Sequence, residues 1–210
     1  LGDVYKRQTI ISSYDFYGVT MIFFIAMMGA TVPANAFLEK HIKNGNTRIF
    51  YSPVSRVSIY SSKILTCFLF MALALTINII IFDTISLVNF GSDKIGYVIL
   101  LIINFVLFLT ILSSAICVTL HSEELTNVIL SNSMSVLGFL SGIFFPIASL
   151  GAIFEKIASF SPIKWTVDCI FQLIYDGQST NYWWIMFALL TLSSLLLLVV
   201  HKNYRPEDYI

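Results

Sequence analysis

Long uncharged blocks of apolar residues alternate with short polar stretches along the chain. A helix needs about 20 mainly apolar residues to cross a hydrocarbon core of about 30 Å. Five blocks reach that length and are bounded by charged or polar positions: residues 16–37, 64–82, 95–120, 127–150 and 182–200. Because lipid cannot satisfy an open backbone, we predict an all-α, polytopic transmembrane helical bundle.

The composition supports lipid as the main solvent of this chain. It is 57% hydrophobic and 11% charged, whereas a soluble domain carries roughly 25% charged residues. The formal net charge is zero, which argues against nucleic acid as a partner. Cys67, Cys117 and Cys169 lie far apart and form neither a metal-ligand spacing nor a disulfide framework.

Basic residues in the connections predict the orientation, because cytoplasmic loops carry an excess of Lys and Arg. The first connection and the C-terminal tail together hold seven of them: Lys40, Lys43, Arg48, Arg56, Lys63, Lys202 and Arg205. The connections on the other side hold three: Lys94, Lys156 and Lys164. We therefore expect the first connection and the C-terminus to be cytoplasmic, in the plasma membrane of a bacterium.

That orientation places the start of the chain outside the cell without an initiator Met. The simplest explanation is a missing first span, so we expect five spans of an original six. Residues 1–8 match nothing downstream, and we interpret them as a non-native N-terminus before a membrane domain at residues 9–210.

The connection at residues 38–63 is too long for a simple turn and too polar to span. Ser52 followed by Pro53 is a helix-start signal, since Ser caps well and Pro fits the first turn. We predict a short amphipathic helix before this step and a second helix that runs from Pro53 into the membrane. A basic loop that binds anionic lipid is an equally good interpretation of the charge alone.

This connection resembles the cytoplasmic connecting segment of ABC-2-type permeases, the membrane subunits of ABC exporters. The matching positions are Glu39-Lys40, Thr47, Arg48, Ser52-Pro53-Val54-Ser55-Arg56 and Lys63-Ile64-Leu65. SSYDFYGVTMIFFIAMMGA and the pair SGIFFPIASL and SFSPIKWTVD resemble flanking segments of the same family, so the likeness covers roughly residues 12–202. Two positions depart from the family pattern: His41 stands where a second Glu is usual, and Asn46 separates Gly45 from Thr47.

The resemblance implies a permease subunit that pairs with a second permease half, as a homodimer or a heterodimer, to form the export route. It also implies a separate nucleotide-binding subunit that uses ATP and Mg, whereas this chain binds no cofactor and has no GxxxxGK[ST] motif of its own. The coupling residues would be Glu39, Lys40, Thr47, Arg48, Ser52, Pro53 and Arg56. The cargo stays open.

A second Ser-Pro step, Ser161-Pro162, opens an expected exterior segment at residues 151–181. Its apolar positions repeat with helical spacing, which predicts an amphipathic or re-entrant helix. The resemblance makes it an exterior gate, with Pro146, Pro162, Trp165 and Phe171 as candidates. A structural anchor is an equally good interpretation.

The predicted spans contain no Asp, Glu, Lys or Arg, which argues against a self-contained ion-coupled transporter. Asn78, Asn104 and Asn132 are their notable amides, suited to helix packing or to cargo contact. No HExxH, CxxC or GxSxG motif points to a metal or catalytic site. A membrane scaffold or sensor subunit and, more remotely, a lipid-modifying membrane enzyme remain as alternative functions.

Overall fold

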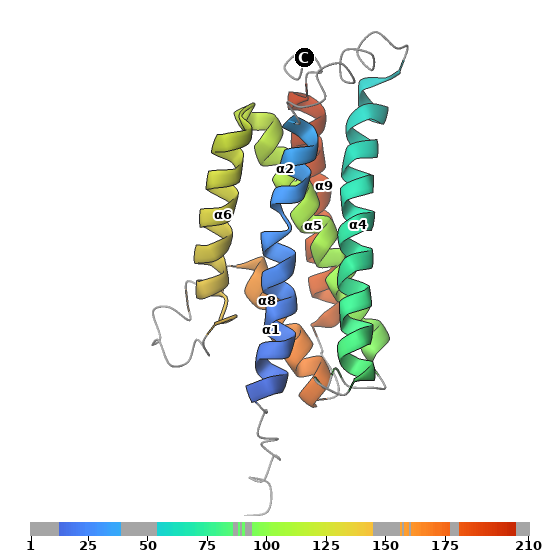
Figure 1. The fold of residues 1–210 in the computed structure, drawn as a ribbon, viewed down its shortest axis with the longest axis vertical. Helices are drawn as coiled ribbons and strands as arrows, with labels where there is room; N and C mark the ends of the chain where they lie inside the picture. Colours follow the sequence, from blue (N-terminus) through green and yellow to red (C-terminus); the bar gives the residue numbers. More distant parts are fainter. Residues whose placement is uncertain are drawn as a thin grey trace, which may run out of the picture.

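The computed structural model describes residues 13–38, 54–85, 88, 90, 94–144, 156, 158–159, 161–176 and 181–204. The described residues form helices and no strand, so the predicted all-α fold is confirmed. Figure 1 shows an elongated bundle of long helices running roughly side by side. In chain order they are α1 (Ser13–Met28), α2 (Thr31–Leu38), α4 (Arg56–Thr84), α5 (Ile95–Leu120), α6 (Glu123–Leu140), α8 (Pro162–Phe171), a π-helical turn η3 (Gln172–Asp176) and α9 (Tyr182–Asn203).

The first apolar block forms one span, Tyr14–Phe37, that is broken between α1 and α2. Pro33 explains the break, because a proline cannot donate to the carbonyl four residues earlier and its ring crowds that group. The carbonyl of Gly29 instead accepts from the backbone N–H of Val32 at 3.0 Å. A Cβ at Gly29 would overlap the end of the Met71 side chain, so glycine at this position lets α4 approach closely.

Helix α5 is the centre of the bundle. It contacts α9, α4, α2, α6 and α8, and most of its residues are buried. Its bounds coincide with the predicted span at 95–120, and the left-handed conformation of His121 (φ 54°) ends it. The predicted spans at 64–82 and 182–200 lie within α4 and α9.

Helix α6 differs from the predicted span at 127–150. It begins at Glu123, where Ser122 caps it by accepting from the N–H of Leu125, and it ends at Leu140. Gly142 follows with φ 81°, a left-handed conformation that glycine adopts readily. Among the described residues, four helical segments are long and apolar enough to span a membrane, and α6 is not one of them.

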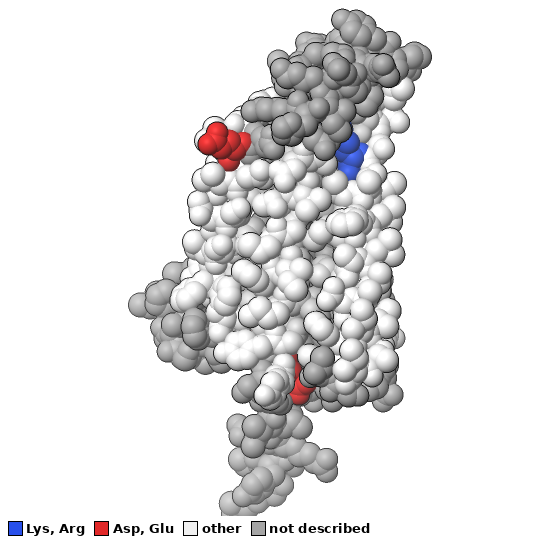
Figure 2. Space-filling model, in the orientation of Figure 1, with Lys and Arg blue, Asp and Glu red and all other residues white. Residues whose placement is uncertain are grey.

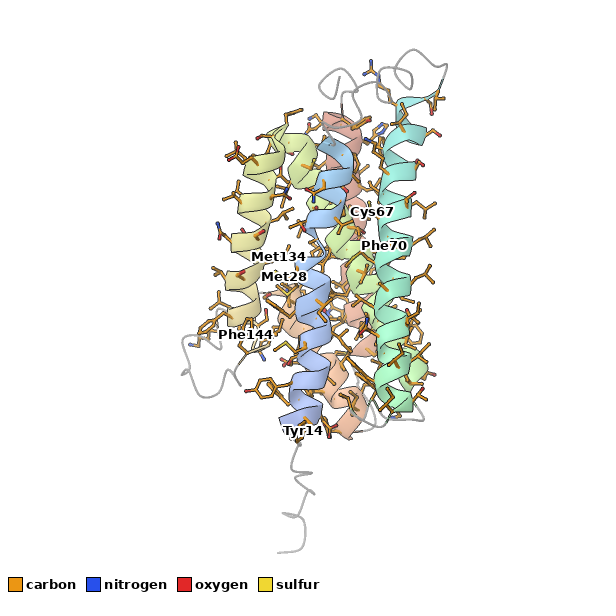
Figure 3. The ribbon with its side chains drawn as sticks, viewed as in Figure 1. Tyr14, Met28, Cys67, Phe70, Met134 and Phe144 are labelled. Atoms are coloured by element: carbon orange, nitrogen blue, oxygen red, sulfur yellow. The ribbon has the colours of Figure 1, made fainter. Side chains whose placement is uncertain are left out.

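Helix α6 packs against the first span through Leu130 and Met134, which are both buried. Figure 3 shows Met28 on α1 and Met134 on α6 at a similar height along the bundle. Lower down, the rings of Phe24 and Phe144 meet edge to face at 5.1 Å. The predicted helix after Ser161 is confirmed as α8, with Ser161 as N-cap and Pro162 in its first turn.

Charged side chains lie towards the two ends of the face seen in Figure 2, and a wide uncharged band separates them. Four described segments could span a membrane by length and composition. This distribution is the one expected of a polytopic membrane protein, in which the uncharged band faces lipid.

Candidate functional site

The candidate site is the end of the bundle where α2 ends, α4 begins and α9 ends, which we call the Arg56 end (Figure 1). It borders the connection in which the sequence places the coupling residues. Of those, Arg56 is described and is exposed at the first position of α4. The others lie outside the described residues: Glu39, Lys40, Thr47, Arg48, Ser52 and Pro53.

The start of α4 differs from the prediction. The helix begins at Arg56 rather than at Pro53, and Ser55 rather than Ser52 is its N-cap. Ser55 has an extended backbone, and its hydroxyl accepts from the N–H of Ser58 at 3.2 Å. This bond satisfies one of the free N–H groups of the first turn, so the second serine of the SPVS sequence fixes the start.

Lys63 joins the first turns of α4 to the end of α2. Its Nζ donates to the backbone carbonyl of Phe37 at 3.4 Å and lies 5.5 Å from the centre of the Phe37 ring. A cation beside the last carbonyls of a helix is favourable, because that end carries a partial negative charge. Lys63 therefore joins the end of α2 to the start of α4, the two helices on either side of the predicted connection.

Tyr60 joins α4 to α9. Its hydroxyl lies 3.0 Å from His201 Nδ1, a hydrogen bond between residues 141 positions apart in the sequence. Its ring meets the Tyr204 ring at 5.4 Å, and Tyr204 in turn meets Phe37 at 6.1 Å, both edge to face. Edge-to-face pairs at such distances stabilise by about 0.5–1.5 kcal/mol beyond their buried area.

We call Phe37, Tyr60, Lys63, His201 and Tyr204 the Tyr60 cluster. Burial raises the pKa of the Tyr204 phenol to about 12, so its hydroxyl stays protonated at physiological pH. The cluster ties three helix ends into one unit at the base of the connection. The Tyr60 cluster can hold the three helix ends together, so that a displacement of one end moves the others. Its groups are not arranged for covalent catalysis.

Sequence reasoning placed Lys63 at this boundary but missed the other four members of the cluster. Tyr60 and His201 sit at the ends of apolar blocks, where aromatic and histidine side chains are ordinary. Their pairing depends on how α4 and α9 pack. A histidine at the end of the last span was the one available signal.

The described candidate gate residues belong to α8, which lies away from the Arg56 end (Figure 1). The Phe171 ring stacks on that of Phe16, in the first turns of α1, at 5.4 Å. Trp165 is partly exposed, and its indole N–H donates to the carbonyl of Ser159 at 2.6 Å. Pro162 is half-buried in α8, whereas Pro146 lies outside the described residues.

The three predicted amides have different surroundings. Asn104 is buried in α5 and donates to the carbonyl of Met186 in α9 at 3.0 Å, an interhelical bond of the kind that the helix-packing interpretation describes. Asn78 donates to the carbonyl of Ala74 in its own helix. Asn132 is exposed on α6.

A fourth amide was missed by the sequence reasoning. Asn127 in α6 donates to Asn35 Oδ1 in α2 at 2.7 Å, next to the Arg56 end. This bond ties α6 to the helix that leads into the connection. Within the described residues, no group of three or more His, Cys, Asp or Glu could hold a metal ion.

A family model described as ABC-2 family transporter protein matches residues 3–200. Comparison with curated proteins and with solved structures finds no match.

Proposed function

Because this chain belongs to the ABC-2 family of transporter proteins, we propose that it is the permease subunit of an ATP-driven ABC exporter whose first connection couples it to a separate nucleotide-binding subunit. The family supports a multi-pass membrane transport component and, in general, an ABC ATPase as its partner. The proposal adds that the Arg56 end faces the cytoplasm, that the cargo leaves the cell, and that two permease halves pair to form the route.

The length of α4 carries the mechanical part of the proposal. Its 29 residues span about 43 Å, which exceeds a hydrocarbon core of about 30 Å. Because its first turns carry Arg56 and Lys63, we place the part that projects beyond the membrane at the Arg56 end. A rigid helix that leaves a docking segment in this way can carry a movement into the bilayer.

The Tyr60 cluster determines what would move with α4. Lys63 holds the end of α2, and Tyr60 holds the end of α9. Closure of two nucleotide-binding subunits on ATP would push the connection, and α2, α4 and α9 would follow together at this end. The partner would hold ATP and Mg, and the permease would supply only the moving route.

Charge reversal tests the coupling. Arg48→Glu and Arg56→Glu should each abolish stimulation of the partner's ATPase in the copurified complex while membrane insertion is retained. Lys94→Glu, at the other end of the bundle, is the matched control and should leave stimulation unchanged. Equal stimulation in all three variants would contradict the proposed docking. ATPase activity that no cargo stimulates would instead favour a scaffold or sensor subunit.

Topology is a separate test. A cysteine at position 48 should react with an impermeant maleimide only after the cells are permeabilised. The native Cys67, Cys117 and Cys169 are buried, which keeps background labelling low. Labelling of intact cells would invert the orientation and remove the basis for coupling through this connection.

A further inference from the structure

A groove of about 460 Å³ lies between α4, α5 and α9 in the half of the bundle nearest the Arg56 end. Phe68 comes from α4, Leu107 and Ile111 come from α5, and Leu197 comes from α9. Leu65, on the rim, is 55% exposed, so the groove opens to the side of the bundle. Its volume is within the range of clefts that bind small ligands.

The polar groups of the groove are concentrated at one end. Ser58, Ser61 and Ser62 contribute its hydroxyls, and all three lie in the first two turns of α4. The walls deeper in the bundle are apolar. Hydroxyls at the membrane edge followed by an apolar channel match an amphiphile with a polar head and a hydrocarbon tail.

The surroundings favour lipid over protein as the occupant. The outward face of α4 continues below the groove as an exposed apolar surface that includes Leu69, Phe70 and Leu73. In a span of this length, that surface lies at the depth of the acyl chains. A lipid in the groove would thus be continuous with the lipid that covers the rest of α4.

The charge at this end favours an anionic head group. The charged side chains that the described parts of α4 and α9 place here are Arg56, Lys63 and Lys202, all basic. Glu124 also lies at this end, but on α6, across the bundle from α4 (Figure 1). Lys63 is held against Phe37 in α2, whereas the Lys202 side chain is exposed on α9 and can extend towards the head-group layer, where it attracts an anionic lipid.

We propose that this groove binds one anionic phospholipid, with an acyl chain along Phe68 and Ile111 and the head group at the three serines. The lipid would fill the space between α4 and its neighbours beside the Tyr60 cluster, of which Tyr60 itself lines the groove. It would therefore stabilise the position of α4 relative to α5 and α9. The groove is separate from the first connection. A negative result for lipid binding would therefore leave the proposed coupling to the ATPase unaffected.

Quenching of tryptophan fluorescence by brominated lipid tests the site. Trp165, Trp183 and Trp184 are first replaced by Phe, and a single tryptophan is then introduced as Phe68→Trp. The matched control is Phe70→Trp, because Phe70 lies at nearly the same depth on α4 and is 63% exposed (Figure 3). Both changes replace one aromatic ring by another, and the full chain is assayed in lipid vesicles without other proteins, so that the introduced tryptophan is the only one observed.

Brominated phosphatidylglycerol should quench Phe68→Trp at a mole fraction about fivefold lower than brominated phosphatidylcholine does. The control Phe70→Trp should show the same curve for both lipids, since it reports bulk lipid. Lys202→Gln should reduce the preference at position 68. Identical quenching curves for the two lipids at position 68 would show that the groove contacts bulk lipid without preference for an anionic head group. Quenching at position 70 but not at position 68 would show that protein covers the groove, and either result would overturn the proposal.

Discussion

Replacing Tyr60 by Phe removes one hydroxyl and leaves the aromatic ring in place. The Tyr60 side chain is 4% exposed, and its hydroxyl makes the 3.0 Å hydrogen bond to His201 Nδ1. The ring contact with Tyr204 at 5.4 Å should survive the change. The substitution therefore isolates the bond that joins the start of α4 to the end of α9.

The expected loss in the free energy of unfolding depends on whether the substitution leaves a buried polar group without a hydrogen bond. A neutral hydrogen bond contributes about 0.5–1.5 kcal/mol net, and in membrane proteins the average is about 0.6 kcal/mol. His201 is exposed, so its nitrogen can bind water once the hydroxyl is gone and no buried group is left unsatisfied. We expect Tyr60→Phe to lower the free energy of unfolding by about 0.5–1 kcal/mol.

A double-mutant cycle measures this bond. His201→Phe keeps a ring at the position and removes the nitrogen, so the double variant should be little less stable than either single variant. The expected coupling energy is about 0.5–1 kcal/mol. Ser194→Ala is the control, because Ser194 is exposed on α9 and its hydroxyl donates to the carbonyl of Thr191 in the same helix. Unfolding would be measured in mixed micelles.

The same variants test whether the bond between Tyr60 and His201 carries movement from α4 to α9. A bias of about 0.5–1 kcal/mol shifts a two-state equilibrium about two- to fivefold, so Tyr60→Phe should reduce permease-stimulated ATPase activity by a factor in that range. The control Ser194→Ala should leave this activity unchanged. Additive stability effects of Tyr60→Phe and His201→Phe would refute the bond. A coupling energy near 1 kcal/mol with unaltered ATPase stimulation would refute its role in transmission.

Three further substitutions test other parts of the bundle. Asn104→Leu should cost less than about 1 kcal/mol in thermal unfolding, because it removes an interhelical bond and also the buried Oδ1 that lacks a hydrogen-bond partner; a larger loss would indicate a further contact. Gly18→Ala should destabilise by about 1–3 kcal/mol, because its Cβ would overlap Val88, whereas Gly96→Ala, with no atom within 4 Å of the new Cβ, should be neutral or stabilising; equal effects would contradict the close packing. Phe171→Ala should lower export in vesicles without loss of the copurified ATPase if α8 gates the route, and unaltered export would favour a structural anchor.

Local signals were sufficient for the elements whose ends depend on nearby residues. The uncharged run between Lys94 and His121 predicts both ends of α5, because a charge at either side stops the apolar segment. Ser161-Pro162 predicts the start of α8 for an equally local reason, the fit of proline to a first helical turn. The family resemblance rested on residue order in the same way, and the family match confirms it.

Where two local signals compete, the sequence alone did not decide between them. Ser52 and Ser55 are both good caps, and the structure uses Ser55. For α6, the apolar composition up to residue 150 predicted a longer helix, but the left-handed Gly142 follows its end at Leu140. A small change of backbone conformation at one glycine outweighs the hydrophobicity of the residues beyond it.

The sequence by itself determined the membrane environment, the helical class and most of the spans, because these depend on composition and on periodicity within a single segment. The order of its motifs indicated the family. Tertiary structure alone decided which ends of the helices are joined. Tyr60 meets His201 across 141 positions, and Asn104 meets Met186 across 82. Such pairs depend on the rotation and depth at which two helices pack, and neither quantity is encoded near either residue.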